Sequence, residues 1–184
     1  MDSTNTNSAS AIPLVVRSGL IITLLSIIFQ FIQYYSGFME KAIGWPGYIF
    51  DVIDCVVVLL LIKKFRDTQM GGAITFKKAF GITFQSFLFA GVISSVFNFI
   101  FFKYMHPEVM DSIMKVSEQK LLAQGLPDDQ IENSLKVTKF LMTNPVVSIL
   151  FFILIYAFMG AISGLIVAAI VKKESKVFLP DVNI

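Results

Sequence analysis

Two aspartates, Asp51 and Asp54, are the residues of this chain whose type and spacing could do chemistry. They lie three positions apart in an otherwise apolar stretch, residues 46–62. On a helix this spacing places both side chains on one face. Acids within an apolar span usually face water or the protein interior, and they often mark ion or proton pathways. The pair therefore predicts either an ion-exchanging site or a structural contact between helices.

Two glutamines of the preceding apolar stretch match the aspartates in depth, counted from the loop between the stretches. Gln33 corresponds to Asp51 and Gln30 to Asp54. In the functional interpretation, water reaches these side chains and the acids exchange a proton or bind a cation. In the structural one, Asp51 lies among lipid headgroups and Asp54, protonated or hydrogen-bonded to Gln30, fastens two helices together. The nearness of the pair to a membrane interface favours the structural interpretation.

The elements that must position these side chains are membrane spans. The 184 residues are 55% hydrophobic and only 15% charged, which is unusual for a soluble domain. Three long segments contain no Asp, Glu, Lys or Arg, and each reaches the ~20 residues that a spanning helix needs. We predict an all-α, integral membrane four-helix bundle with spans at about 14–38, 46–62, 79–102 and 145–171.

Charge bias orients the bundle. Basic residues are concentrated between spans two and three and after span four (Lys63, Lys64, Arg66, Lys77, Lys78, Lys172, Lys173, Lys176). By the positive-inside rule these segments are cytoplasmic. We therefore expect both termini in the cytoplasm, with a flexible polar N-terminal tail (1–13), a membrane domain (14–173) and a cytoplasmic C-terminal tail (174–184).

The long segment between spans three and four, residues 103–142, has a different character. It carries five lysines and six acidic residues, and Pro107, Gly125 and Pro127 are suited to helix ends. Apolar residues recur in it at helical spacing. We expect an extracytoplasmic amphipathic helical hairpin, either lying on the membrane surface or capping the bundle. A helical cap is favoured over a surface that docks a partner.

Small residues mark the faces through which the last two spans pack. Membrane helices associate closely where small side chains recur every four residues. We expect span three to pack against span four in the chain's own bundle, rather than against a second copy, through two such sets (Ser86, Ala90, Ser94, Asn98; Gly160, Gly164, Ala168).

Several classes of activity have no support in the sequence. With one cysteine, Cys55, and one histidine, His106, the chain offers no internal disulfide and no multi-thiolate metal site. We find no base to activate a serine and no phosphate-binding loop. We therefore expect no enzymatic activity and no metal or cofactor. The basic residues lie at helix ends rather than in a patch, so no nucleic acid is expected.

The loop between spans two and three carries a family resemblance. Residues 66–80 read RDTQMGGAITFKKAF, in which Gly71-Gly72 permits a tight turn and Thr75 can cap the next helix. With the long outer segment and the glycine-rich last span, this pattern resembles an uncharacterised family of small bacterial inner-membrane proteins, domain of unknown function 4199. The resemblance covers residues 14–173. It implies the bacterial cytoplasmic membrane and contributes no activity and no catalytic residue.

Two functions follow from these observations. The first is a non-enzymatic membrane protein that acts through helix or surface contacts as an accessory or structural subunit. The second is a small oligomeric transporter or proton-coupled carrier that uses membrane-embedded Asp54 and Asp51. Besides the lipid bilayer, the partners considered are a second copy of the chain and another membrane protein.

Overall fold

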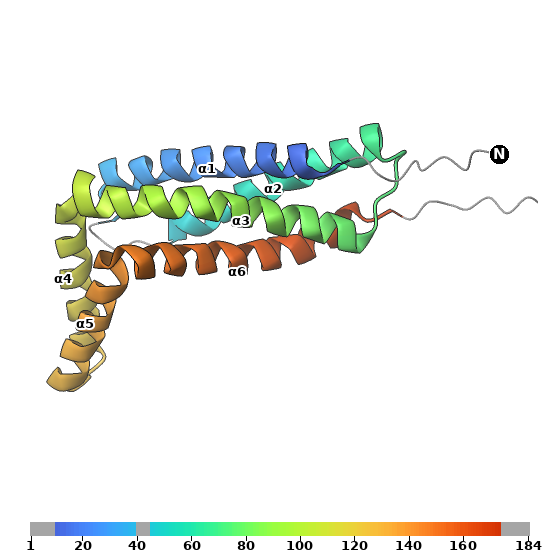
Figure 1. Ribbon diagram of the computed structural model, residues 1–184. Coiled ribbons are helices and arrows are strands. Elements are labelled where there is room, and N and C mark those ends of the chain that lie inside the picture. Colours follow the sequence, from blue (N-terminus) through green and yellow to red (C-terminus); the bar gives the residue numbers. More distant parts are fainter. Residues whose placement is uncertain (1–9, 40–44, 174–184) are drawn as a thin grey trace, which may run out of the picture.

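The structure, a computed structural model, describes residues 10–39 and 45–173 (Figure 1). Most of both predicted tails lies outside these residues. The described chain is helical, which confirms the all-α class, and Phe101–Met105 continues α3 as a π-helix. The helices are α1 (Ile12–Tyr35), α2 (Trp45–Gln69), α3 (Phe76–Ile100), α4 (Pro107–Ala123), α5 (Asp128–Thr143) and α6 (Pro145–Val171).

Four long helices, α1, α2, α3 and α6, lie side by side, and α4 and α5 project across one end of them as a hairpin (Figure 1). We call this the hairpin end. The opposite end, which we call the terminal end, holds the start of α1, the turn between α2 and α3, and the end of α6. The described chain is therefore a four-helix bundle with an arm at one end.

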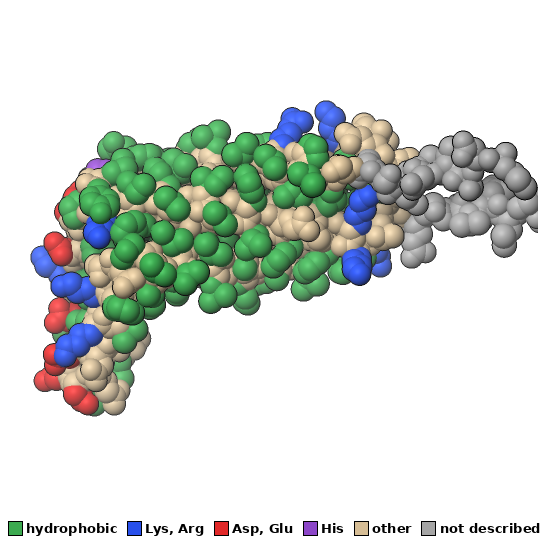
Figure 2. All heavy atoms as spheres, in the orientation of Figure 1, with side chains coloured by type: hydrophobic (Ala, Val, Ile, Leu, Met, Phe, Trp, Pro, Cys, Tyr) green, Lys and Arg blue, Asp and Glu red, His purple; other side chains and the backbone are tan. Residues whose placement is uncertain are grey.

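Three of the long helices are long and apolar enough to cross a membrane: α1, α3 with its π-helical extension, and α6. Hydrophobic side chains cover much of the visible bundle surface. Lys and Arg lie near the terminal end, and on the hairpin they are mixed with Asp and Glu (Figure 2). α2 is as long as α3 but contains Asp51 and Asp54 within its apolar stretch. It continues to Gln69, beyond the predicted limit at residue 62, because a helix need not end where its apolar stretch ends.

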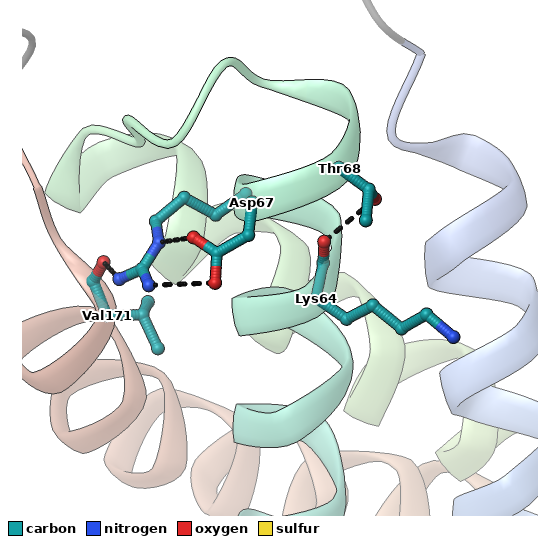
Figure 3. A network of polar contacts seen from close by, with 5 residues as sticks. Lys64, Asp67, Thr68 and Val171 are labelled. Atoms are coloured by element: carbon teal, nitrogen blue, oxygen red, sulfur yellow. Dashed lines mark hydrogen bonds and ion pairs between the residues drawn. The ribbon is translucent and has the colours of Figure 1, made fainter.

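Polar contacts close the terminal end of the bundle. Arg66 of α2 donates from Nη1 to the carbonyl oxygen of Val171 on α6 at 2.9 Å, and its Nε contacts Asp67 Oδ1 at 2.7 Å (Figure 3). The backbones of Ile74 and Lys173 exchange two hydrogen bonds of 2.9 Å. Thr75 forms the predicted cap by accepting from the Lys78 backbone N–H at 3.3 Å. The α2–α3 turn is thus tied to the end of α6.

The glycines of α6 pack against phenylalanines of α3, and these two helices form the most extensive contact of the bundle. A Cβ placed on Gly160 would lie 2.7 Å from Phe87 Cβ, and one on Gly164 would lie 2.9 Å from Phe80 Cδ2. Both distances are shorter than real Cβ contacts. A side chain at Gly160 would therefore require the helices to separate.

The small-residue face of α3 differs from our expectation, because part of it turns toward α1 instead of α6. Ser86 Oγ lies 2.6 Å from Ser18 Oγ, and a Cβ on Gly19 would lie 3.0 Å from the Ser86 carbonyl oxygen. A spacing of four identifies one face of a helix but not the neighbour it meets. Bulky phenylalanines, rather than small residues, fill the α6 glycine positions from the α3 side.

The hairpin is joined to the bundle by a cluster at the start of α4. Glu108 Oε1 accepts from the Tyr34 hydroxyl at 3.0 Å and lies 2.9 Å from His106 Nδ1. Hydrogen bonds from its own backbone, from His106 and from Tyr34 lower the pKa of the Glu108 carboxyl. The rings of Tyr34 and His106 also pack together, with centroids 3.9 Å apart and planes tilted by 36°. This cluster links the end of α1 to the base of the arm.

Candidate functional site

A cavity of about 500 Å³ lies in the hairpin half of the bundle, among α1, α2, α3 and α6. It brings together the four polar residues singled out in the sequence, from two helices, with polar residues of two others. Its polar lining comprises Ser26, Gln30, Gln33, Asp51, Asp54, Ser94, Asn98 and Tyr156. The remaining lining is mainly aromatic and aliphatic.

Helical spacing explains how each side of the cavity is built. On α1, Ser26, Gln30 and Gln33 follow at intervals of four and three, so they share one face. On α2, Asp51 and Asp54 are one turn apart on the face that meets them. The two glutamines and the two aspartates, which the sequence placed at matching depths, line the same cavity.

Three of these side chains, Gln30, Asp54 and Ser94, are buried and leave a polar atom without a hydrogen-bond partner among the described residues. Gln30 and Asp54 are 6% and 8% exposed. Within the described residues, Gln30 Nε2 and Asp54 Oδ1 have no hydrogen-bond partner. A buried polar group without a partner costs about 1–3 kcal/mol. The clasp in which Asp54 bonds Gln30 is thus not formed through these atoms, although both residues line the cavity.

Three other polar residues of the cavity, Ser26, Asn98 and Tyr156, are hydrogen-bonded within the protein. The Tyr156 hydroxyl donates to Ser26 Oγ at 2.9 Å, and Ser26 Oγ donates to the Ile22 carbonyl oxygen, also at 2.9 Å. Asn98 Nδ2 donates to the Ser94 carbonyl oxygen at 2.9 Å. Tyr156 was missed by the sequence reasoning, although it is a tyrosine deep within an apolar span, away from the interfaces where tyrosine is expected.

Aromatic rings form much of the apolar wall. Phe29 and Phe50, which line the cavity together with the two aspartates, stack with ring centroids 3.6 Å apart. None of the described residues that line the cavity is Lys, Arg or His. Four further phenylalanines complete the wall (Phe87, Phe97, Phe102, Phe152). Among the described residues, the cavity therefore combines two carboxyl groups with aromatic surface and carries no basic side chain in its lining.

The base of the hairpin also reaches the cavity. Ile113 of α4 and Met142 of α5 are among its lining residues, together with Phe38 and Met39 from the turn after α1. The rest of the hairpin extends away from the bundle (Figure 1). The sequence left open whether the hairpin lies on the membrane surface or caps the bundle. Its base borders the cavity as a cap would.

The remaining candidates lie elsewhere or do not form a site. The glycine face Gly160, Gly164 and Ala168 packs in the bundle, with Gly160 and Gly164 against α3 and Ala168 buried in the core, and none of the three lines the cavity. Ala90 is fully buried, and Ser86 meets Ser18. In the described part of the chain, no group of three or more His, Cys, Asp or Glu is placed to hold a metal ion.

Comparison with known proteins adds a family but no activity. The model of a family described as "Protein of unknown function (DUF4199)" matches residues 17–173, which is most of the chain. No curated protein and no solved structure matches the chain.

Proposed function

Because the chain belongs to the DUF4199 family, whose description assigns no function, we propose its role from the cavity alone. The family membership confirms the resemblance seen in the sequence. We propose a non-enzymatic, multi-pass protein of the bacterial cytoplasmic membrane that binds a small molecule in the cavity, as a small carrier does. The observation that supports this role most directly is that Gln30 and Asp54 line the cavity and each keeps a buried polar atom without a hydrogen-bond partner among the described residues.

Size and polarity both favour binding over a purely structural role. Small-molecule sites usually occupy about 300–1,000 Å³, are mainly apolar and contain a few convergent polar groups. A cavity of about 500 Å³ with this lining falls in that range. A structural contact between helices normally fills its space and pairs its buried polar atoms. Neither holds here for Gln30 and Asp54.

The proposal includes a topology. We place α2 across the membrane as a fourth span, because it lies beside three helices that are long and apolar enough to cross one. The basic residues gathered at the terminal end favour placing that end, with both termini, in the cytoplasm. The hairpin is then extracytoplasmic and the cavity lies in the outer half of the membrane. A ligand would enter from outside.

An accessory role through surface contacts is the second candidate, and one observation favours it. Three large apolar side chains of the hairpin, Leu122, Val137 and Phe140, are each more than half exposed. Exposed apolar surface of this kind marks lipid or protein contacts. It does not explain the unpaired atoms inside the bundle, so we rank it below the binding role.

The test is cysteine labelling with a membrane-impermeant maleimide in intact cells, in a Cys55→Ser background. Ser26→Cys and Gln33→Cys place the thiol in the cavity, whereas Leu24→Cys and Ile32→Cys place it at similar depth on exposed apolar positions of the same helix. We expect the cavity pair to be labelled and the control pair to be protected until detergent denaturation. Equal protection of all four would overturn the proposal, because water would not reach the cavity.

A further inference from the structure

We propose that the ligand of this cavity is a monovalent organic cation, an amine with an aromatic or branched apolar body. This inference rests on the proposed function, since it names the class of molecule that the cavity binds. It is carried by three features of the described lining residues: two carboxyl groups with no basic side chain among those residues, a buried amide whose Nε2 is unpaired there, and a wall of phenylalanine rings.

Charge selects the sign of the ligand. Asp51 and Asp54 are the only ionisable acids among the described lining residues, and no Lys, Arg or His faces them there. A buried carboxylate is unfavourable unless it is paired and hydrogen-bonded. An ammonium group in the cavity would pair with the Asp54 carboxyl, whose Oδ1 has no hydrogen-bond partner among the described residues. A neutral ligand would offset less of the cost of burying these carboxylates, and an anionic ligand would be repelled by them.

The Gln30 carboxamide completes the polar end of the site. Its Nε2 is buried and unpartnered, and it lines the same space as Asp54. A carboxamide presents either its nitrogen or its oxygen by turning about its last bond. With the oxygen turned inward, Gln30 accepts a second hydrogen from the ammonium group. One amide and two carboxyls then surround the positive charge.

The aromatic wall selects an organic cation over a bare metal ion. Phe29 and Phe50, which line the cavity together with Asp51 and Asp54, are stacked. A cation is attracted to the face of an aromatic ring, and an apolar body packs against such rings. Calcium and magnesium instead need about six to eight oxygen ligands. No group of three or more metal-ligating acids, histidines or cysteines occurs in the described ranges.

The experiment uses three probes with one naphthalene body and different head groups: 2-(1-naphthyl)ethylamine, 2-(1-naphthyl)ethanol and 1-naphthylacetate. At pH 7 these are cationic, neutral and anionic, since an alkylamine titrates near the lysine value of about 10 and a carboxylate near 4. Binding to the full chain in phosphatidylcholine nanodiscs is followed by naphthalene fluorescence anisotropy, with empty nanodiscs as the partition blank. Asp51→Asn/Asp54→Asn removes both charges, and Asp67→Asn at the terminal end is the matched acid control.

We expect the amine to bind at least about ten-fold more tightly than the alcohol, and the acetate to bind least, because ten-fold corresponds to one desolvated ionic contact of modest strength. The double variant should lose that preference while the Asp67→Asn variant keeps it. The preference among probes is measured on the natural chain, so a failure of the variant to fold leaves the test decisive.

Two results would overturn the inference in different ways. Equal binding of amine and alcohol, or a preference that survives in the double variant, would show a small-molecule site that does not select cations. The proposed function would then stand and the ligand class would fall. If none of the three probes binds but Ser26→Cys and Gln33→Cys are labelled, the ligand class would again be wrong and the proposed function would stand. Absence of binding with protected cysteines would remove both the ligand class and the binding function.

Discussion

The two halves of the bundle use similar residues in opposite ways. In the terminal half, Gly19 and Gly164 allow close packing, and Ser18 and Ser86 meet across the helices at 2.6 Å. In the hairpin half, the same polar face of α1 continues with Gln30, which borders a cavity and has an unpaired Nε2. One half is packed and the other half is open, although a single stripe of small and polar residues runs through both.

Side-chain length explains this difference. The hydroxyl groups of short side chains can donate to a carbonyl oxygen of their own helix. Thr23 donates to the Gly19 carbonyl oxygen at 2.9 Å, and Thr83 donates to that of Ala79 at 3.0 Å. Such residues can be buried in a tight seam at little cost. Glutamine and aspartate do not close this bond on their own helix here, and they require a partner from elsewhere. Long polar groups within a span therefore indicate a site more strongly than short ones do.

The largest expected effect comes from filling the packed half. Gly19→Leu should lower the free energy of unfolding by about 3 kcal/mol, the upper part of the usual range for overpacking. A Cβ there already lies 2.6 Å from Phe89 Cδ1 and 3.0 Å from a backbone oxygen. Gly81→Leu is the control, because nothing lies within 4 Å of a Cβ at Gly81. Unfolding in mixed micelles measures the stability of both variants. Equal losses of stability in Gly19→Leu and Gly81→Leu would contradict close packing at Gly19.

The opposite sign is expected in the open half. Asp54→Leu should raise the free energy of unfolding by about 1–3 kcal/mol, because it removes a buried group whose Oδ1 has no partner within the described protein. The same variant should lose cation binding, so stability and function change in opposite directions. A marked loss of stability in the same micelle assay would show that Asp54 has a structural partner after all.

A smaller change is expected where two serines meet. Ser18→Ala should lower stability by about 0.6 kcal/mol, typical of a hydrogen bond between membrane helices. The Ser86 hydroxyl also lies 2.8 Å from the Ile82 carbonyl oxygen and can donate there, so it is not left unpaired. Thr83→Val, which removes a bond within one helix, serves for comparison. A loss of stability several times larger for Ser18→Ala than for Thr83→Val would mean that the packing of α1 against α3 depends on the Ser18–Ser86 contact.

The smallest effect concerns pH at the terminal end. The hydrogen bond and charge of Arg66 lower the pKa of the exposed Asp67 carboxyl. Its contribution to stability is therefore present above the unfolded-state pKa of about 3.9 and is lost as the pH falls through the lower folded-state value. The unfolding temperatures of the natural chain and of Asp67→Asn should differ slightly at pH 7 and converge as the pH falls below the folded-state pKa of Asp67. A constant difference would rule out this assignment.

The sequence was sufficient for the helical class and for the three long apolar helices, because the absence of charge over about 20 residues leaves few alternatives. It also identified Gln30, Gln33, Asp51 and Asp54, since their spacing fixes a common face. It could not show the space between them. Whether facing polar residues touch or enclose a cavity depends on side chains of all four helices, including Tyr156 and the phenylalanines.

The sequence was also insufficient to assign neighbours. The interval of four in Ser86, Ala90, Ser94 and Asn98 describes one face of α3, but that face meets α1 at Ser86 and the cavity at Ser94 and Asn98. The crossing of two helices decides which turn of a face meets which neighbour. That crossing depends on large residues such as Phe80 and Phe87, which no spacing rule assigns to a partner.

The tight contact between α3 and α6 has a mechanical consequence. These helices cannot slide without forcing Phe87 against Gly160, so they form a fixed frame. α2, which carries both aspartates, has the least contact with α3 and only limited contact with α1 and α6. We therefore expect α2 to move more readily than α3 and α6, and spin labels should report a ligand-dependent α2–α6 distance beside a constant α3–α6 distance. The acids and Phe50 would then move with α2, while Phe87, Phe97 and Phe152 stay in place on the frame.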